Sequence, residues 1–131
     1  MSRGSLLLVA WLAFAQPTVA ADAVPVATVE QPRSFGHVLG DVLTQRVRLL
    51  REGREVQPSA MPAADRVNVF LERRASRIET DELGARWLVI EYQVINGPRA
   101  LTLTSIPAES LATDAGPLQV PAWPVSVGPL T

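Results

Sequence analysis

Trp87-Leu88-Val89-Ile90-Glu91-Tyr92-Gln93-Val94-Ile95 is the stretch that decides the fold class. Its apolar residues alternate, with Leu88, Ile90, Tyr92 and Val94 on one face and Trp87, Val89, Glu91 and Gln93 on the other. This period of two predicts a β-strand, and the following Asn96-Gly97-Pro98 is a turn signal that ends it. We expect Tyr92 to lie in the core, whereas Trp87 is either covered by another segment or part of an adhesive surface.

Short apolar runs on both sides of this strand are separated by many of the 11 prolines. They predict strands over 27–31, 42–50, 101–106, 111–113, 118–120 and 125–127, and one from Arg66 that continues, bent or bulged, through Ile78. In 42–50 the inner face is Leu43, Val47 and Leu49, and in the strand from Arg66 the residues Val67, Val69 and Leu71 share a face. Such a series predicts an all-β fold, a single immunoglobulin-like antiparallel sandwich without a disulfide.

A helix over residues 33–51 is the competing interpretation, because Phe35, Val38, Leu39, Val42 and Leu43 also fit one helical face. Two glycines and several β-branched residues in that stretch argue against it.

The chain of 131 residues is long enough for one domain, which we place at residues 24–131. It contains no cysteine, which excludes disulfides, thiolate metal sites and cysteine nucleophiles. Its 12 basic and 13 acidic residues nearly balance, so no long-range positive field would attract nucleic acid.

Residues 1–23 have the order of a secretory signal peptide. Arg3 precedes the short apolar run 6–15, Pro17 follows it, and small residues allow cleavage after Ala21 or after Ala23. Ten apolar residues are fewer than the roughly 20 that span a bilayer. We therefore expect an exported, periplasmic protein; a buried N-terminal helix of a cytosolic domain is the alternative.

No catalytic, cofactor-binding or metal-binding motif is found, so we expect a protein that is not an enzyme and has no cofactor of its own. His37 is the single histidine, and no Gly-x-Ser-x-Gly elbow or phosphate-binding glycine loop accompanies it. The acidic residues are scattered over turns and form no calcium-binding loop. Two arginine groups, Arg46 with Arg48 and Arg73 with Arg74 and Arg77, fit a solvated sheet face better than an acidic partner's surface.

Three stretches resemble MxaA-type proteins, which are accessory proteins associated with methanol dehydrogenase. They are QPRSFGHVLGDVLTQRV at 31–47, LVIEYQVINGPR at 88–99 and LQVPAWPVSVGPL at 118–130. Together they cover most of residues 24–131, and a looser similarity extends to the BatD-like oxygen-tolerance proteins.

The resemblance implies a periplasmic assembly factor that acts by protein-protein interaction when calcium is inserted into a quinoprotein methanol or alcohol dehydrogenase. The pyrroloquinoline quinone would then belong to the partner enzyme. The family pattern includes a C-terminal membrane anchor that does not follow residue 131 here, so membrane proximity would require an anchor missing from this sequence. The alternatives are a BatD-like envelope interaction module with another partner and a metal-delivery protein that binds calcium itself.

The candidate partner-contact surface is the loop that opens the first resembling stretch, together with one tryptophan near the end of the chain. Its residues are Arg33, Phe35, Gly36, Gly40, Asp41 and Trp123. Functional residues are preferentially carried on loops, and Gly40 is expected to allow a tight turn before the next strand.

Overall fold

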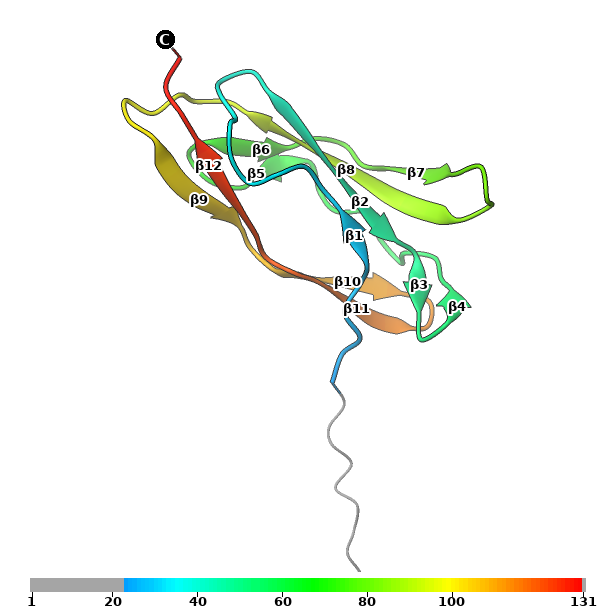
Figure 1. The fold of residues 1–131 in the computed structure, drawn as a ribbon. Helices are drawn as coiled ribbons and strands as arrows, with labels where there is room; N and C mark the ends of the chain where they lie inside the picture. Colours follow the sequence, from blue (N-terminus) through cyan, green and yellow to red (C-terminus); the bar gives the residue numbers. More distant parts are fainter. Residues whose placement is uncertain (1–22, 131) are drawn as a thin grey trace, which may run out of the picture.

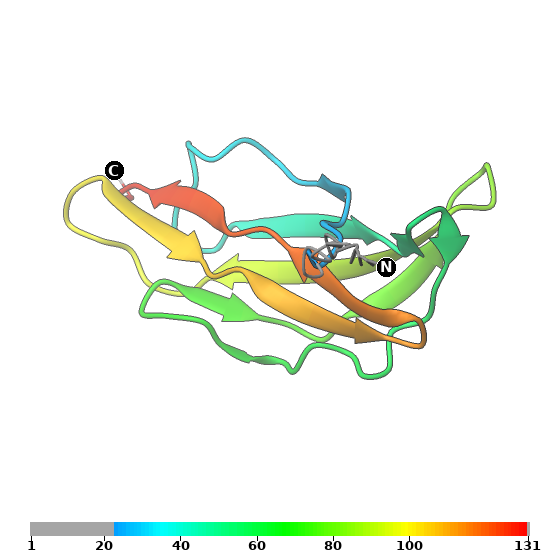
Figure 2. The same ribbon diagram turned by 90° about the horizontal axis from the view of Figure 1, so that it is seen from below.

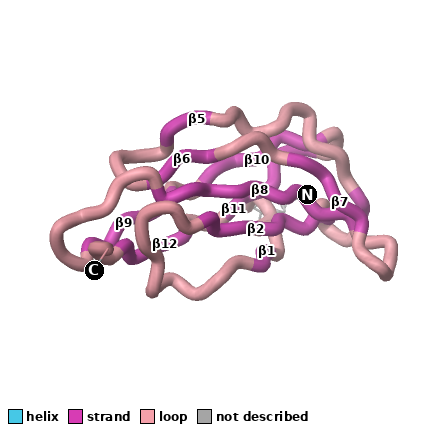
Figure 3. Tube along the Cα trace, turned by 90° about the horizontal axis from the view of Figure 1, so that it is seen from above, coloured by secondary structure: helices cyan, strands magenta, loops and turns pink. Residues whose placement is uncertain are grey.

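The fold is known from a computed structural model that describes residues 23–130, and the described part contains only strands and loops (Figure 3). The strands are β1 Val29–Glu30, β2 Val42–Arg48, β3 Leu50–Arg51, β4 Arg54–Glu55, β5 Asp65–Arg66, β6 Leu71–Arg73, β7 Arg77–Thr80, β8 Arg86–Val94, β9 Thr102–Ile106, β10 Glu109–Thr113, β11 Gly116–Val120 and β12 Trp123–Val127. The prediction of an all-β chain with antiparallel sheets is confirmed. The helix considered for residues 33–51 is wrong, because that segment is a loop followed by β2 and β3.

The first layer is a sheet in the order β1-β2-β8-β6-β5, with β7 also paired to β8. Its centre is the antiparallel pair β2–β8, in which Leu43 lies opposite Tyr92 and Val47 opposite Leu88. These inward residues are almost fully buried, as the alternation of the sequence predicts. Gln45 lies on the same inner face and is also buried. Its side-chain amide donates a hydrogen bond to the Oε1 of Gln31, which offsets the cost of burying this polar group.

β6 and β7 run along β8 as one bulged strand. The backbone N–H of Arg74 donates to the carbonyl of Glu91, and Arg77 lies opposite Val89. Ala75 and Ser76 thus face the single residue Ile90, and this extra residue is a β-bulge. The predicted continuation through Ile78 is confirmed, with its bulge.

The first part of that predicted strand is wrong, because the segment 67–70 is a tight turn between β5 and β6. The Asn68 Oδ1 accepts hydrogen bonds from the backbone N–H groups of Phe70 and Leu71, which closes the turn. Asp65 then pairs with Arg73 across the hairpin. As a result only Leu71 of the expected apolar face is fully buried, while Val69 is exposed to solvent.

The second layer is one long hairpin that carries β9 and β10 on one arm and β11 and β12 on the other (Figure 2). The pairs Trp123–Ile106 and Val120–Glu109 keep one continuous register, although the ladder is interrupted at Pro107 and Pro121. A proline stands at each interruption and lacks the backbone N–H that a ladder bond needs, whereas Pro117 and Pro124 are accommodated within the paired strands.

The N-terminal segment 25–37 lies between the two layers at one side (Figure 1). Ala27 N–H donates to the Gln119 carbonyl, β1 then pairs with β2, and Ser126 N–H donates to the carbonyl of Ser34. On the opposite edge of the second layer, Pro58 forms an isolated bridge with Thr113. A short hairpin, β3–β4, precedes this bridge.

The core fills the space between the layers and receives side chains from both. From the first layer come Leu43, Val47, Leu71, Leu88, Ile90, Tyr92 and Val94, and from the second Ile106, Leu111, Leu118, Val120, Trp123, Val125 and Val127. Burial of this apolar surface is the main stabilising term for a chain without disulfides.

The expected signal peptide, residues 1–23, falls almost entirely outside the described residues. Among the described residues, there is no helix with the length and apolar character needed to cross a bilayer.

Candidate functional site

The loop 33–41, which carries most of the predicted contact residues, is fixed to both layers. Ser126 N–H donates to Ser34 O at 2.6 Å and Gly128 N–H donates to His37 O at 2.8 Å, both from the last strand and the residue after it. At the other end Gly40 N–H donates to Val94 O at 2.9 Å. The loop is therefore held by hydrogen bonds along its length, and not only at its two ends, so it has a defined conformation on the surface.

Arg33 and Phe35 form the exposed part of this loop. The Arg33 Nε donates to the Phe35 carbonyl at 3.1 Å, and its guanidinium lies 5.4 Å from the centre of the Phe35 ring, a cation–π geometry. The ring is nevertheless 64% exposed. An aromatic side chain offered to solvent on a fixed backbone has the character of a binding anchor.

His37, Gly36, Gly40 and Asp41 shape the loop. The His37 Nε2 donates to the Arg33 carbonyl at 2.8 Å, and the Asp41 Oδ2 accepts from Val38 N–H at 2.9 Å. Gly36 and Gly40 have φ angles of 89° and 94°, a region that disfavours any residue with a Cβ. Three of the predicted contact residues, Gly36, Gly40 and Asp41, are therefore explained by the turn itself.

Trp123 does not belong to this surface, and its assignment as a contact residue is corrected. It is 1% exposed and packs edge-to-face on Tyr92, with ring centroids 6.2 Å apart and an interplanar angle of 79°. Its position explains this, because Trp123, Val125 and Val127 alternate onto the same inward face of β12. A partner cannot reach its side chain in the folded domain.

The start of β9 lies at the same end of the molecule as the loop 33–41 (Figure 1). Two leucines at this position, Leu101 and Leu103, are 72% and 74% exposed. Leu103 pairs with Ser126, and a Cβ at Gly128 would lie 3.8 Å from Leu101 Cδ1 and 3.9 Å from the carbonyl oxygen of His37. The signal was present in the sequence: Ile106 is inward, so a period of two places Leu101 and Leu103 outward.

The arginine groups are paired within the chain, and Arg46 and Arg77 agree with a solvated sheet face. Arg73 does not, because its side chain is 15% exposed and pairs with Glu109 of β10. Arg46 bonds Glu30 at 3.0 Å, Arg48 bonds Glu55 at 2.6 Å, and Arg77 bonds both Glu79 and Glu91. Arg74 donates to the side chain of Gln93. These arginine side chains therefore interact with partners within the domain.

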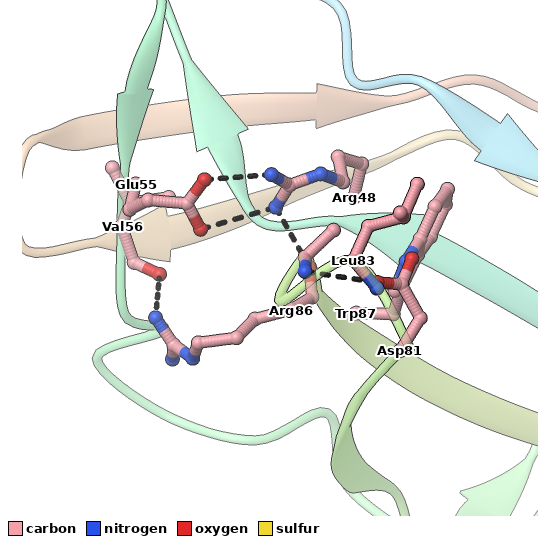
Figure 4. A network of polar contacts seen from close by, with 8 residues as sticks. Arg48, Glu55, Val56, Asp81, Leu83, Arg86 and Trp87 are labelled. Atoms are coloured by element: carbon pink, nitrogen blue, oxygen red, sulfur yellow. Dashed lines mark hydrogen bonds and ion pairs between the residues drawn. The ribbon is translucent and has the colours of Figure 1, made fainter.

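Figure 4 shows how one of these pairs joins three segments near the start of β8. The guanidinium of Arg48 donates to Glu55 and to the carbonyl of Arg86, while Arg86 donates to the carbonyl of Val56. The hydrogen bond from Arg48 lowers the pKa of the Glu55 carboxyl. The network fastens the β3–β4 hairpin to the first layer.

Trp87 is covered by this outer face, so it does not form an exposed patch. The guanidinium carbon of Arg46 lies 4.7 Å from the centre of its ring, and its indole Nε1 donates to Asp81 Oδ2 at 3.0 Å. The Trp87 side chain is 7% exposed.

The acidic side chains and the histidine of the described part of the chain are dispersed. Within residues 23–130 no three His, Asp or Glu side chains are grouped so that they could hold a metal ion. The hollow beside β5 and β6 is lined by charged residues of both signs, among them Asp65, Arg66 and Glu72.

The molecule thus offers a fixed loop with an exposed aromatic ring and, on the other side of β12, two exposed leucines at the start of β9. When the chain was compared with protein-family models, with curated proteins and with solved structures, none of the three comparisons found a match.

Proposed function

We propose that this protein is an exported interaction module that holds a protein partner through the loop 33–41, without covalent chemistry. The observation that carries the proposal is the combination at Phe35: its ring is 64% exposed while its loop is hydrogen-bonded to β8 and to the end of β12. A preorganised loop loses little conformational entropy on binding, so contact area at Phe35 converts efficiently into affinity.

The chemistry of the loop defines the complementary surface. Arg33 lies against the Phe35 ring, so a partner would offer an apolar pocket with an acidic group at its rim. Gly36, Gly40 and Asp41 would act indirectly, by fixing the loop's backbone.

We further propose that the sandwich is immunoglobulin-like. The first layer has the order β1-β2-β8-β6, which corresponds to the A-B-E-D order of that fold. In the second layer, residues 57–59 lie beside β10 and the hairpin follows, which corresponds to the C-F-G order.

The biological role we propose is the one implied by the resemblance to MxaA-type proteins. The chain would act in the periplasm during maturation of a quinoprotein methanol or alcohol dehydrogenase, when calcium is inserted. Calcium and quinone would both be bound by the enzyme.

The test is co-purification and crosslinking of the tagged protein from its native host, grown with and without methanol. Phe35→Ala is compared with Leu83→Ala, because Leu83 is 93% exposed on the β7–β8 turn at the other end of the first layer (Figure 1). We expect recovery of a quinoprotein dehydrogenase, with affinity about tenfold lower for Phe35→Ala, the size typical of an aromatic anchor.

Recovery of other envelope proteins under both growth conditions would reject the methanol role and favour a BatD-like module. Calorimetric titration with calcium tests the metal-delivery alternative, since tight binding by this chain alone would contradict a purely protein-binding mechanism. Equal partner recovery by Phe35→Ala and Leu83→Ala would exclude the loop as the contact.

A further inference from the structure

The outer edge of β9 is an open strand edge. In the second layer β10 is flanked by residues 57–59, while β11 and β12 are flanked by the N-terminal segment. Among the described residues, no backbone group pairs with the far side of β9; the one polar contact there is the Asn68 Nδ2, which donates to Ser105 O at 3.3 Å and to Thr104 Oγ1 at 2.9 Å.

The backbone groups that face this open edge can be identified from the neighbouring strand. Ser126 and Gly128 donate their N–H groups away from β9, to the N-terminal segment. Backbone direction alternates along a strand, so Val125 and Val127 face β9, and their opposite residues Thr104 and Thr102 face β12. Leu103 and Ser105 therefore direct their backbone groups outward, and the contact of Asn68 with the Ser105 carbonyl agrees.

This edge lacks the protection seen on the other edges. Edge strands are usually guarded against unwanted pairing by charge, proline or short length. β1 has two residues and ends in Glu30, β5 is Asp65–Arg66, and β7 carries Arg77 and Glu79. β9 is five residues long, with neither charge nor proline, and Leu101 and Leu103 beside the open groups are more than 70% exposed.

We propose that β9 pairs antiparallel with β9 of a second copy of this chain, about a twofold axis at Leu103. In this register each Leu103 lies opposite its own copy, and Leu101 lies opposite Ser105 of the other chain, so outward-directed residues meet outward-directed residues. The Ser105 carbonyl can accept a second hydrogen bond beside that from Asn68, because a carbonyl oxygen has two lone pairs.

The occupant is a second copy because the edge is complementary to itself. A charged residue near a twofold axis would lie opposite the same charge of the second copy and be repelled. Residues 101–106 contain no charged residue. The pairing also brings the exposed leucines of both copies onto one face, where they lose contact with water. The loop 33–41 lies on the far side of β12 from this edge, so dimerisation goes beyond the proposed partner contact and leaves it accessible.

The test uses single cysteines, which give an unambiguous result because the chain has no cysteine of its own. Across a hydrogen-bonded antiparallel pair the Cα atoms are about 5.5 Å apart, within the range that a disulfide bridges. In protein purified in the form the host accumulates, Leu103→Cys is expected to form a disulfide-linked dimer at least about tenfold faster than Leu83→Cys. The Leu83 side chain is the more exposed of the two but is distant from the axis.

Sedimentation equilibrium provides the second measurement, on the protein without cysteine. We expect a dimer whose dissociation constant rises about tenfold or more in Leu103→Arg, because two like charges then lie opposite each other, and is unchanged in Leu83→Arg. A monomer up to millimolar concentration, a dimer indifferent to Leu103→Arg, or equal crosslinking at 103 and 83 would each overturn the proposal. None of these outcomes depends on the dehydrogenase partner, so failure here leaves the proposed function standing.

Discussion

The outer faces of the two layers differ in the side chains that they present to solvent. On the first, Arg46, Arg48, Arg74 and Arg77 each have a carboxylate or side-chain amide partner, and Trp87 is covered by Arg46. On the second, around β9, the exposed side chains are leucines and the strand is neutral. Charged side chains thus cover the outer face of the first layer, whereas the neutral surface around β9 is left open for binding.

The largest expected effect on stability concerns the inner side of the second layer, where Trp123 is part of the core. Trp123→Ala should destabilise the domain by about 3–5 kcal/mol, because it leaves a cavity against Tyr92. Chemical denaturation measures this loss. A cost below about 1 kcal/mol would place Trp123 at the surface and would undo the contrast between the two sides of β12.

An intermediate effect is expected where an ion pair joins the layers instead of lying on one. Arg73 bonds Glu109 at 2.5 Å from β6 to β10, and the arginine side chain is 15% exposed. Glu109→Ala leaves this guanidinium without its carboxylate, retaining the hydrogen bond from Nε to the Ala63 carbonyl, and should cost about 1.5–3 kcal/mol. The matched control is Glu30→Ala, whose pair with Arg46 is open to solvent and contributes less than about 1 kcal/mol. Equal losses in the two variants would show that position between the layers does not matter.

The smallest effect is a pH dependence at the turn before β8. Asp81 accepts hydrogen bonds from Trp87 Nε1 and from the backbone N–H groups of Leu83 and Ala85, which hold its pKa below the ordinary value. A lowered pKa means that the carboxylate stabilises the fold at neutral pH and that this contribution is lost as pH falls through the folded-state pKa. The difference in unfolding free energy between the protein and Asp81→Asn should therefore shrink from pH 7 to pH 3. A constant difference would mean that the ionised carboxylate is not responsible.

Much of the fold could be predicted where alternation is long and uninterrupted. The inner faces of 88–94 and of 42–50 follow directly from a period of two. The turn at 67–70 could not be predicted this way, because Asn68 interrupts a stretch whose apolar residues still alternate. The burial of Val89 on the outer face was also beyond the pattern, since it depends on neighbouring strands that are distant in sequence.

The candidate site was predictable in part. The glycines and Asp41 announced a tight loop, and Phe35 within it is exposed. Trp123 was predicted at the surface together with the loop 33–41, although its parity with Val125 and Val127 places it on the inward face of β12. The open edge of β9 could not have been found from sequence. It arises because the segment 57–64 pairs with β10 and then turns toward β5 without pairing with β9.

The pairing of the N-terminal segment with the last strand has a consequence for the time course of folding. Ala27 bonds Gln119 and Ser34 bonds Ser126, so residues from the beginning of the domain require strands from its end. The β10–β11 hairpin can form locally and early, whereas these contacts span most of the chain and close slowly. Until the last strand has emerged from the ribosome or crossed a membrane, the segment 25–37 has no partner in the second layer. The domain is therefore complete only after β12 has become available.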